Sequence, residues 1–311
     1  PRDPADPAYA WGPTDAYVQQ AAAHGMLGRV MFTLWSTPRW AGAHVRHATT
    51  ADMPNLRYWR DFVQACARRY SGRYIPPGAT EPLPRVTAWE TWNEPNAIFA
   101  LRPQLAHGVA VSPRNYVKLL NALKREVRSA IPQRSTFVAG AFYKQGGSQG
   151  LTPVEFMRGM QAAGATFDVL SMHPYNRTAT LGLRDGLRES TTNPSFIGIA
   201  NLGTFISLAN GIFHRRYPVW VTEFGWRTTS PGARRRSVTL RQQAIFARQA
   251  ITHLRTLPQV QRAAWFLLRD DPPREAGDWY TSGLLRQNGA RKPSFGAWRG
   301  AARHLPQSPI H

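Results

Sequence analysis

The chain of 311 residues is long enough for one large α/β barrel or for two medium domains, and its length alone does not choose between them. Its composition, with 42% hydrophobic and 18% charged residues, is that of a globular protein; no run of about 18 apolar residues occurs, which excludes a transmembrane helix. The segment from Pro1 to Pro7 has no apolar stretch behind a basic end, so no secretory signal is predicted within this chain. A signal removed earlier is compatible with this start.

The charge is strongly unbalanced, with 39 lysines and arginines against 18 aspartates and glutamates, or +21 in net terms, and nearly all of the positive charge is arginine. Such a balance favours an anionic partner, such as nucleic acid, an acidic polysaccharide or an anionic cell envelope. A solvated arginine-rich surface without any partner explains the composition equally well. Both interpretations are kept. The single cysteine, Cys66, permits no internal disulfide and lies on a helical apolar pattern, which indicates a buried structural thiol.

Helical and strand-like patterns alternate along the whole chain, as is typical of a parallel α/β fold. The predicted helices cover residues 14–24, 55–70, 112–130, 152–164, 196–210 and 238–257. The predicted strands cover residues 29–36, 85–92, 136–141, 167–172, 218–222 and 262–268. Thr14 and Ser112 are expected to cap their helices, and Thr152 to Glu155 forms a predicted capping box with proline at the first helical position.

Six strands, each followed by a connection long enough for a helix, predict a (β/α)8 TIM barrel in which the first two strands are absent from this chain. The deficit is expected at the start, because no strand precedes residue 14. No linker, repeat or change of composition divides the sequence, so residues 1–311 are predicted to form a single barrel catalytic domain that is incomplete at its N-terminal end.

Carboxylates and aromatic residues gather where the predicted strands end, which is where barrel enzymes carry their active sites. These residues are Glu94, Glu223, His173, Tyr175, Trp35 and Trp265. Two carboxylates are the minimal equipment for cleaving a glycosidic bond, and aromatic rings stack on sugar faces. The acidic pair Asp270-Asp271, after the last strand, is interpreted as a solvated loop outside the site.

Several motifs, in the correct order, resemble those of known enzymes. The segment from Trp92 to Asn96 looks like the Asn-Glu-Pro signature that ends the fourth strand in clan A glycoside hydrolases, which are retaining enzymes on a (β/α) barrel. The segment from Thr222 to Trp226 resembles their seventh-strand motif. Together with the segments Leu34 to Ala41, Trp89 to Asn96 and Met172 to Tyr175, the sequence looks most like glycoside hydrolase family 39.

This resemblance implies that Glu94 is the acid/base and Glu223 the nucleophile of a retaining O-glycoside hydrolase. It implies that Asn93 hydrogen-bonds the 2-hydroxyl of the sugar and that Tyr175 orients or stabilises the nucleophile. His173 would help to line the end of the sixth strand of the family barrel.

The resemblance also implies that Trp265 forms a platform at the cleaved sugar. It assigns Trp35 to the substrate site less firmly, because residues of the third strand vary in role within the family. No metal site and no cofactor are predicted. The expected partner is an oligo- or polysaccharide, which the basic charge suggests is acidic, and family analogy suggests a secreted or cell-envelope location. Two alternatives stay open: a catalytically silent carbohydrate-binding barrel, and a basic binder of anionic polymers.

Overall fold

The structure is a computed structural model that describes residues 1–42, 49–176, 195–228, 237–272 and 280–302. The chain divides into two compact units. Unit 1 comprises Pro1–Ala141, Gln149–Leu151 and Glu155–Leu170, and unit 2 comprises Phe142–Ser148, Thr152–Val154 and Ser171–His311. None of the helices in the described part of the chain is long and apolar enough to cross a membrane.

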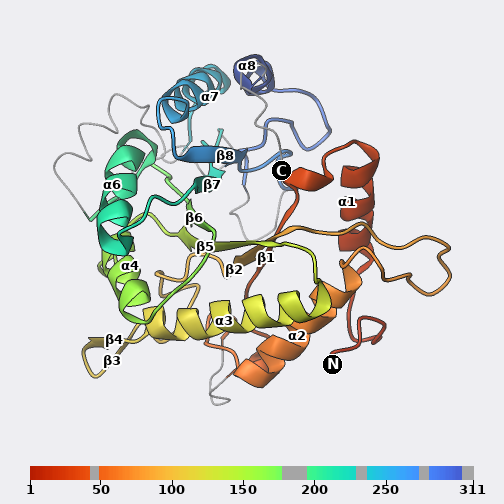
Figure 1. Ribbon diagram of the computed structural model, residues 1–311. Coiled ribbons are helices and arrows are strands. Elements are labelled where there is room, and N and C mark those ends of the chain that lie inside the picture. Colours follow the sequence, from red (N-terminus) through yellow and green to blue (C-terminus); the bar gives the residue numbers. More distant parts are fainter. Residues whose placement is uncertain (43–48, 177–194, 229–236, 273–279, 303–311) are drawn as a thin grey trace. The chain divides into compact units, whose positions relative to one another are not determined.

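All six predicted strands are present and form one sheet, in which the strand order β1-β2-β5-β6-β7-β8 follows the chain (Figure 1). Their bounds are β1 Met31–Leu34, β2 Ala88–Thr91, β5 Thr136–Phe142, β6 Val169–Met172, β7 Val219–Phe224 and β8 Val260–Trp265. The registers are parallel, for example Met31 opposite Ala88 and Ala88 opposite Thr136 in unit 1, and Val219 opposite Val260 in unit 2. The prediction of an α/β fold with part of a (β/α)8 barrel is therefore confirmed.

The central strands β2, β5 and β6 are buried on both faces, as parallel strands usually are, whereas β8 is partly exposed. All four residues of β2 are buried, and so are the last six residues of β5. Tryptophan fills part of this interior, since Trp89 in β2 and Trp92 just beyond it are both 0% exposed. The strand exits are therefore fixed by large side chains that leave little freedom to the backbone behind them.

Six helices among the described residues overlap predicted ones, and the helix predicted at 196–210 is observed at Leu202–Phe213. The α-helices of the described residues are α1 Gly12–Ala23, α2 Leu56–Arg69, α3 Ser112–Ala130, α4 Pro153–Ala162, α6 Leu202–Phe213, α7 Leu240–Leu254 and α8 Pro293–Ala302. In unit 1, α2 and α3 lie side by side, and the indole of Trp59 donates to the carbonyl of Leu119 at 3.1 Å (Figure 1). In unit 2, α7 and α8 lie side by side, and Ser294 donates to Gln243 at 2.7 Å.

Two predicted caps are wrong. Thr14 lies inside α1, which begins at Gly12 after Trp11, because Pro13 fits the first turn and needs no N–H partner. Ser112 is likewise the first residue of α3, and its hydroxyl donates to the Gln104 side chain at 3.0 Å instead of capping the helix. Asn55 and Thr239 do cap α2 and α7, where they accept from the backbone N–H groups of Arg57 and Gln242.

Two strands and one α-helix among the described residues have no counterpart among the predicted elements. The short hairpin β3 Leu105–Ala106 and β4 Val109–Ala110 stands after β2, and α8 follows β8. The hairpin strands have two residues each, too few to show an alternating pattern. The α8 sequence contains two glycines and a weak apolar period, so its helix depends on tertiary contacts such as that between Ser294 and Gln243.

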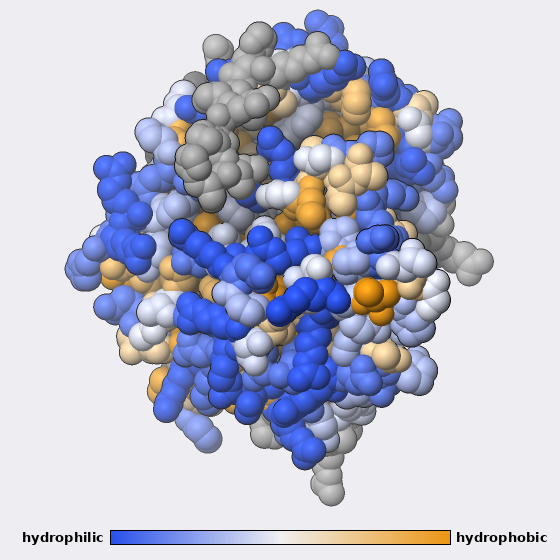
Figure 2. Space-filling model, turned by 45° about the vertical axis from the view of Figure 1, so that its right-hand side comes forward, coloured by the Kyte–Doolittle hydropathy of each residue, from blue (hydrophilic) through white to orange (hydrophobic). Residues whose placement is uncertain are grey.

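The surface agrees with the composition. In the view of Figure 2, hydrophilic side chains cover most of the visible face, and apolar side chains form smaller patches between them.

Candidate functional site

In unit 2, Glu223 lies near the carboxyl end of β7 with its side chain 26% exposed. The hydroxyl of Tyr175 donates to Glu223 Oε2 at 2.9 Å. Nδ1 of His173, whose side chain is 1% exposed, lies 3.7 Å from the same oxygen. The structure thus brings together three of the predicted site residues, Glu223, Tyr175 and His173.

The chain reaches this arrangement through the turn that follows β6. The backbone N–H of His173 donates to Phe142 at 3.1 Å, and that of Tyr175 donates to the carbonyl of His173 at 2.9 Å. Pro174, between them, has no N–H to continue a ladder, so the strand ends here. The turn leaves His173 buried and Tyr175 partly exposed on the side of Glu223.

A phenol that donates to a carboxylate stabilises its ionised form, and an imidazole at 3.7 Å adds a favourable field whenever it is protonated. The hydrogen bond from Tyr175 orients the Glu223 carboxylate and favours its ionised form, and the side chain stays partly accessible. Such a group can act as a nucleophile or stabilise a developing positive charge.

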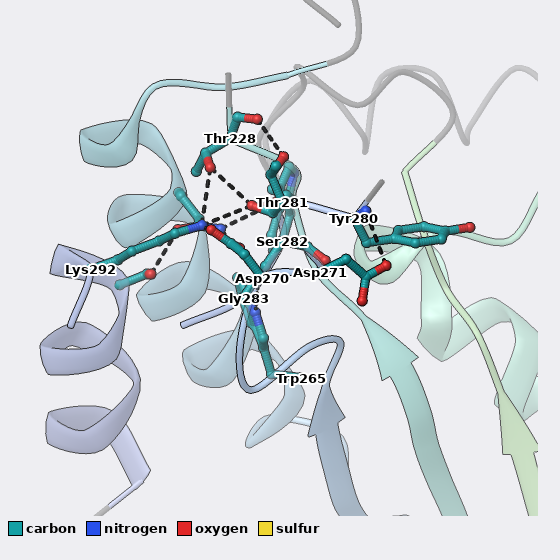
Figure 3. A network of polar contacts seen from close by, with 12 residues as sticks. Thr228, Trp265, Asp270, Asp271, Tyr280, Thr281, Ser282, Gly283 and Lys292 are labelled. Carbon is teal, nitrogen blue, oxygen red and sulfur yellow. Dashed lines mark hydrogen bonds and ion pairs between the residues drawn. The ribbon is translucent and has the colours of Figure 1, made fainter. Parts of the chain in front are cut away.

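Trp265, the last residue of β8, is held within an aromatic cluster of unit 2. Its ring centroid lies 5.4 Å from that of Phe224, 5.8 Å from that of Trp226 and 5.7 Å from that of Trp298. Its indole Nε1 donates to the carbonyl of Ser282 at 2.7 Å (Figure 3). The ring orientation is thereby fixed by one hydrogen bond and three ring contacts.

The segment that carries Ser282 is itself tied down by Lys292, which is 3% exposed and lies just before α8. Its ammonium donates to Asp270 Oδ1 at 2.7 Å, to the carbonyl of Thr281 at 2.9 Å and to the hydroxyl of Thr228 at 3.1 Å (Figure 3). Asp270 Oδ1 also accepts from the backbone N–H of Gly283 at 2.8 Å. We call Lys292, Asp270, Thr228 and Thr281 the ammonium cluster.

Burial lowers the pKa of Lys292 from its ordinary value, and the pairing with Asp270 opposes this shift. The interpretation of Asp270 as a solvated loop residue is therefore wrong, since its side chain is 13% exposed and serves as the counter-ion of a buried lysine. The physical reason is that a buried ammonium needs a carboxylate and further acceptors.

In unit 1, Glu94 is partly buried and follows β2 in a left-handed conformation with φ of 47°, and Trp92 has φ of 64°. The backbone N–H of Trp92 donates to Leu34 at 2.8 Å, and that of Glu94 donates to Ala141 at 3.0 Å. The turn is thus fixed to the ends of the two neighbouring strands, β1 and β5. Asn93, between these residues, is partly buried.

The loop beyond Glu94 is anchored by amide side chains. Asn96, which is 0% exposed, donates to the carbonyl of Leu151 at 2.9 Å. Gln104, which is 5% exposed, donates to the carbonyls of Pro95 at 2.8 Å and Leu101 at 2.7 Å. Because buried amides must be paired, these bonds hold the loop in one shape.

Two tryptophans of unit 1 have different environments. The indole of Trp92 donates to the carbonyl of Ala100 at 2.8 Å and packs against Trp59 at a centroid distance of 5.6 Å, so it belongs to the core beneath the loop. Trp35, directly after β1, is 49% exposed. Its indole is therefore solvent-accessible next to a strand exit, and its predicted contact with substrate stays a prediction.

No group of three or more His, Cys, Asp or Glu side chains within the described ranges is arranged to hold a metal ion. Burial raises the pKa of the Cys66 thiol well above its usual range, which makes the thiol a poor nucleophile and agrees with its predicted structural role.

Sequence reasoning missed the ammonium cluster, although the composition contains a signal for it. The chain has 4 lysines against 35 arginines, which together make the 39 basic residues. Lys124 and Lys292 are buried, at 8% and 3% exposure, and Lys144 donates to the carbonyl of Asn176 at 2.6 Å. Three of the four lysines thus act as compact, hydrogen-bonded cations, whereas the fourth, Lys118, is exposed.

Comparison with known proteins agrees with this picture. Residues 84–298 match the model of the family described as glycosyl hydrolase catalytic core. A search of curated proteins found no match.

Among solved structures, a family 39 glycoside hydrolase from the gut symbiont Bacteroides cellulosilyticus WH2 is similar, with a TM-score of 0.67, 18% identity, and coverage of 96% of this chain and 55% of that one. A monomeric beta-xylosidase from Caulobacter crescentus CB15 has a TM-score of 0.57, 18% identity, and coverage of 94% of this chain and 56% of that one. A family 39 enzyme from Xanthomonas axonopodis pv. citri has a TM-score of 0.58, 15% identity, and coverage of 96% of this chain and 56% of that one.

The chain therefore spans about half the length of these structures, and at such identities the likeness is one of fold. The sequence resemblance to a clan A glycoside hydrolase of the family 39 type is confirmed at the level of fold and family model. Because the matched residues 84–298 make up more than half of the 311, the chain belongs to the glycosyl hydrolase catalytic core family.

Proposed function

We propose that this protein is a retaining O-glycoside hydrolase, with Glu223 as the nucleophile and Glu94 as the acid/base. The observation that carries the proposal is the environment of Glu223, a strand-terminal carboxylate that accepts from Tyr175 at 2.9 Å and lies 3.7 Å from His173. A carboxylate that is oriented by a phenol and still partly accessible is the group that a double-displacement mechanism needs. Membership of the glycosyl hydrolase catalytic core family supports the reaction class.

In the first step, an oxygen of Glu223 attacks the anomeric carbon, and the bond to the leaving-group oxygen breaks as Glu94 gives that oxygen a proton. The products are a glycosyl ester on Glu223 and the released alcohol. In the second step, Glu94 removes a proton from water, the resulting oxygen attacks the anomeric carbon, and the carboxylate of Glu223 leaves. If a sugar hydroxyl replaces water, the same site transfers the glycosyl group.

The remaining predicted residues have substrate roles in this scheme. Asn93 would hydrogen-bond the 2-hydroxyl, Trp265 would support the cleaved sugar on its fixed ring, and Trp35 would contact the substrate from the exit of β1. Tyr175 and His173 would keep Glu223 ionised and oriented. The proposed substrate is an oligo- or polysaccharide. The net charge of +21 suggests that this saccharide is acidic. A secreted or cell-envelope location would bring the enzyme to such polymers.

The proposal is tested with a panel of aryl glycosides on the parent chain and on Glu94→Gln, Glu223→Gln and Glu81→Gln. Loss of a general acid or a nucleophile is expected to lower kcat by at least about a hundredfold. Glu81, an exposed loop residue of unit 1, is the matched control and should leave kcat unchanged. Azide added to Glu223→Ala should restore turnover as a glycosyl azide of inverted configuration, whereas azide added to Glu94→Ala should give the retained product.

Two outcomes would contradict the assignment. Saturable binding of glycans by the parent chain, without any product, would mean a silent carbohydrate-binding barrel. A crystal structure in which the two carboxyl groups stand about 6.5–9.5 Å apart, instead of about 5–5.5 Å, would indicate an inverting enzyme and remove Glu223 from the nucleophile's role.

A further inference from the structure

The exposed aromatic side chains of unit 1 are concentrated after two strands. Five aromatic residues are exposed among its described residues. Trp35 (49%) and Trp40 (64%) lie between β1 and α2, Tyr58 (41%) lies in the first turn of α2, and Phe99 (47%) lies in the loop after β2. The fifth, Tyr17 (60%), lies on α1. Tryptophan is usually largely buried, and grouped exposed aromatics mark binding surfaces. We call residues 35–42 and 49–58 the rim segment.

Within the rim segment, Trp40 and Tyr58 form one surface. Their ring centroids are 5.3 Å apart at an interplanar angle of 66°. The backbone fixes them together, because Asn55 N–H donates to the carbonyl of Ala41 at 2.8 Å and Gly42 pairs with Pro54 as a β-bridge. Two rings already held in place lose little conformational entropy when a ligand stacks on them.

The rim segment is hydrogen-bonded to the loop that begins at Glu94. Arg102 N–H donates to the carbonyl of Ala51 at 2.7 Å, and Met53 N–H donates to the carbonyl of Arg102 at 2.8 Å. Ala97 N–H, in the same loop, donates to the carbonyl of Glu94 at 2.9 Å. The aromatic pair and the proposed acid/base therefore belong to one connected loop system at the carboxyl ends of β1 and β2.

Each ring of the pair has an arginine as its sequence neighbour, Arg39 beside Trp40 and Arg57 beside Tyr58, and both arginines are exposed. Across the part of the chain that the structure describes, no carboxylate pairs with either guanidinium. The acid of the segment, Asp52, is engaged, since its side chain accepts the backbone N–H of Thr49 at 2.5 Å. The rim segment thus carries two exposed aromatic rings in contact and two exposed arginines adjacent to them in the sequence.

We propose that the rim segment binds an acidic polysaccharide next to the cleavage site, with Trp40 and Tyr58 stacked on sugar rings and Arg39 and Arg57 paired with uronate carboxylates. The apolar C–H face of a pyranose matches an aromatic ring, and a guanidinium matches a carboxylate with two parallel hydrogen bonds. A neutral chain would use the rings and leave both arginines without a counter-charge. The inference rests on the proposed glycosidase function and gives its substrate a chemical class.

Binding is measured separately from turnover, by calorimetry on the Glu223→Gln variant with oligogalacturonate, oligomannuronate and a neutral β-glucan oligosaccharide of equal length at 50, 150 and 500 mM NaCl. At least one uronate should bind ten or more times more tightly than the neutral chain at 50 mM NaCl, and this preference should shrink as salt rises. Trp40→Ala should weaken uronate binding at least tenfold, and Trp40→Phe should retain most of it. Arg39→Gln with Arg57→Gln should abolish the preference for uronate.

Tyr17→Ala and Arg134→Gln, an exposed aromatic and an exposed arginine outside the rim segment, are the matched controls and should bind like the parent. Equal affinity for neutral and acidic chains, no binding of either uronate, or Trp40→Ala behaving like Tyr17→Ala would each overturn the proposal. Turnover of short aryl glycosides distinguishes this failure from failure of the proposed function. The Trp40 variants and the Arg39→Gln, Arg57→Gln double variant should keep that turnover because a short aryl glycoside does not extend to these side chains, whereas the Glu94 and Glu223 variants lose it.

Discussion

At the scale of single residues, the orientation and charge of Glu223 are influenced by two neighbouring side chains. Tyr175 and His173 come from the turn after β6 and meet the same oxygen of Glu223, at 2.9 and 3.7 Å. The buried imidazole is held by the strand end, and the phenol is the direct hydrogen-bond donor. The phenol of Tyr175 therefore favours the ionised form of Glu223 by a direct hydrogen bond.

Tyr175→Phe removes this donor and leaves the ring in place. A hydrogen bond to a charged group contributes about 1.5–3 kcal/mol, so kcat/KM should fall by roughly tenfold to a hundredfold. The acidic limb of the pH profile should also move to higher pH, because the variant carboxylate loses a bond that favours its ionised form. Tyr280→Phe, at an exposed tyrosine of unit 2, is the control; an unmoved acidic limb in Tyr175→Phe would show that the phenol has no electrostatic role.

The strand-exit residues could be predicted from the sequence because a glutamate after an apolar β-branched or aromatic run is placed at an exit by the strand itself. The partner of Trp265 could not be predicted. The carbonyl of Ser282 is 17 residues away along the chain, and a backbone carbonyl leaves no trace in the sequence. Lys292 and Asp270 were out of reach for the same reason, since only folding joins the two loops.

At the scale of elements, the loop after Glu94 depends on Gly150. This glycine has φ of 130°, and a Cβ there would lie 2.1 Å from the carbonyl oxygen of Asn96. Gly150→Ala should therefore lower the free energy of unfolding by about 3 kcal/mol and reduce kcat as the loop shifts. Gly164→Ala, at φ of 72° with nothing within 4 Å, tests conformation without the clash and should cost only about 1–2 kcal/mol, as measured by urea unfolding.

The ammonium cluster ties the segment that holds Trp265 to the start of α8. Lys292→Met leaves Asp270 buried without its cation and should lower the free energy of unfolding by about 3–5 kcal/mol. Adding Asp270→Asn removes the unpaired charge and should restore part of this loss. Guanidinium titrations of the two variants measure the difference, and a double variant that is no more stable than Lys292→Met would contradict the ion-pair account.

The elements whose apolar residues recur with a regular period could be predicted from the sequence, and the elements without such a period could not. α3 was predicted at its observed bounds because nineteen residues with a regular apolar face leave little choice. The β3–β4 hairpin and α8 carry no such period, and packing decides their structure. The caps failed at Thr14 and Ser112 because a neighbouring proline allowed each helix to begin earlier.

At the scale of the whole molecule, the reactivity of the Cys66 thiol reports whether the core of unit 1 opens. It is the only cysteine of the chain, is 2% exposed, and burial raises the pKa of its thiol. Reaction with a thiol reagent in native buffer should therefore be at least about a thousandfold slower than in denaturant, because it requires opening of the core of unit 1. Rapid reaction without denaturant would show that this core opens locally. Reductant should leave the free energy of unfolding unchanged.

The left-handed backbone at Trp92 and Glu94 has a consequence for laboratory selection. Each residue with a Cβ costs about 1–2 kcal/mol in this conformation, and the bonds to Leu34 and Ala141 hold both in it. A library screened for heat tolerance alone would therefore reward glycine at position 94 and discard the carboxylate. A screen that also requires turnover has to find its gains elsewhere, so improved variants of this chain should keep both residues and carry their substitutions away from this turn.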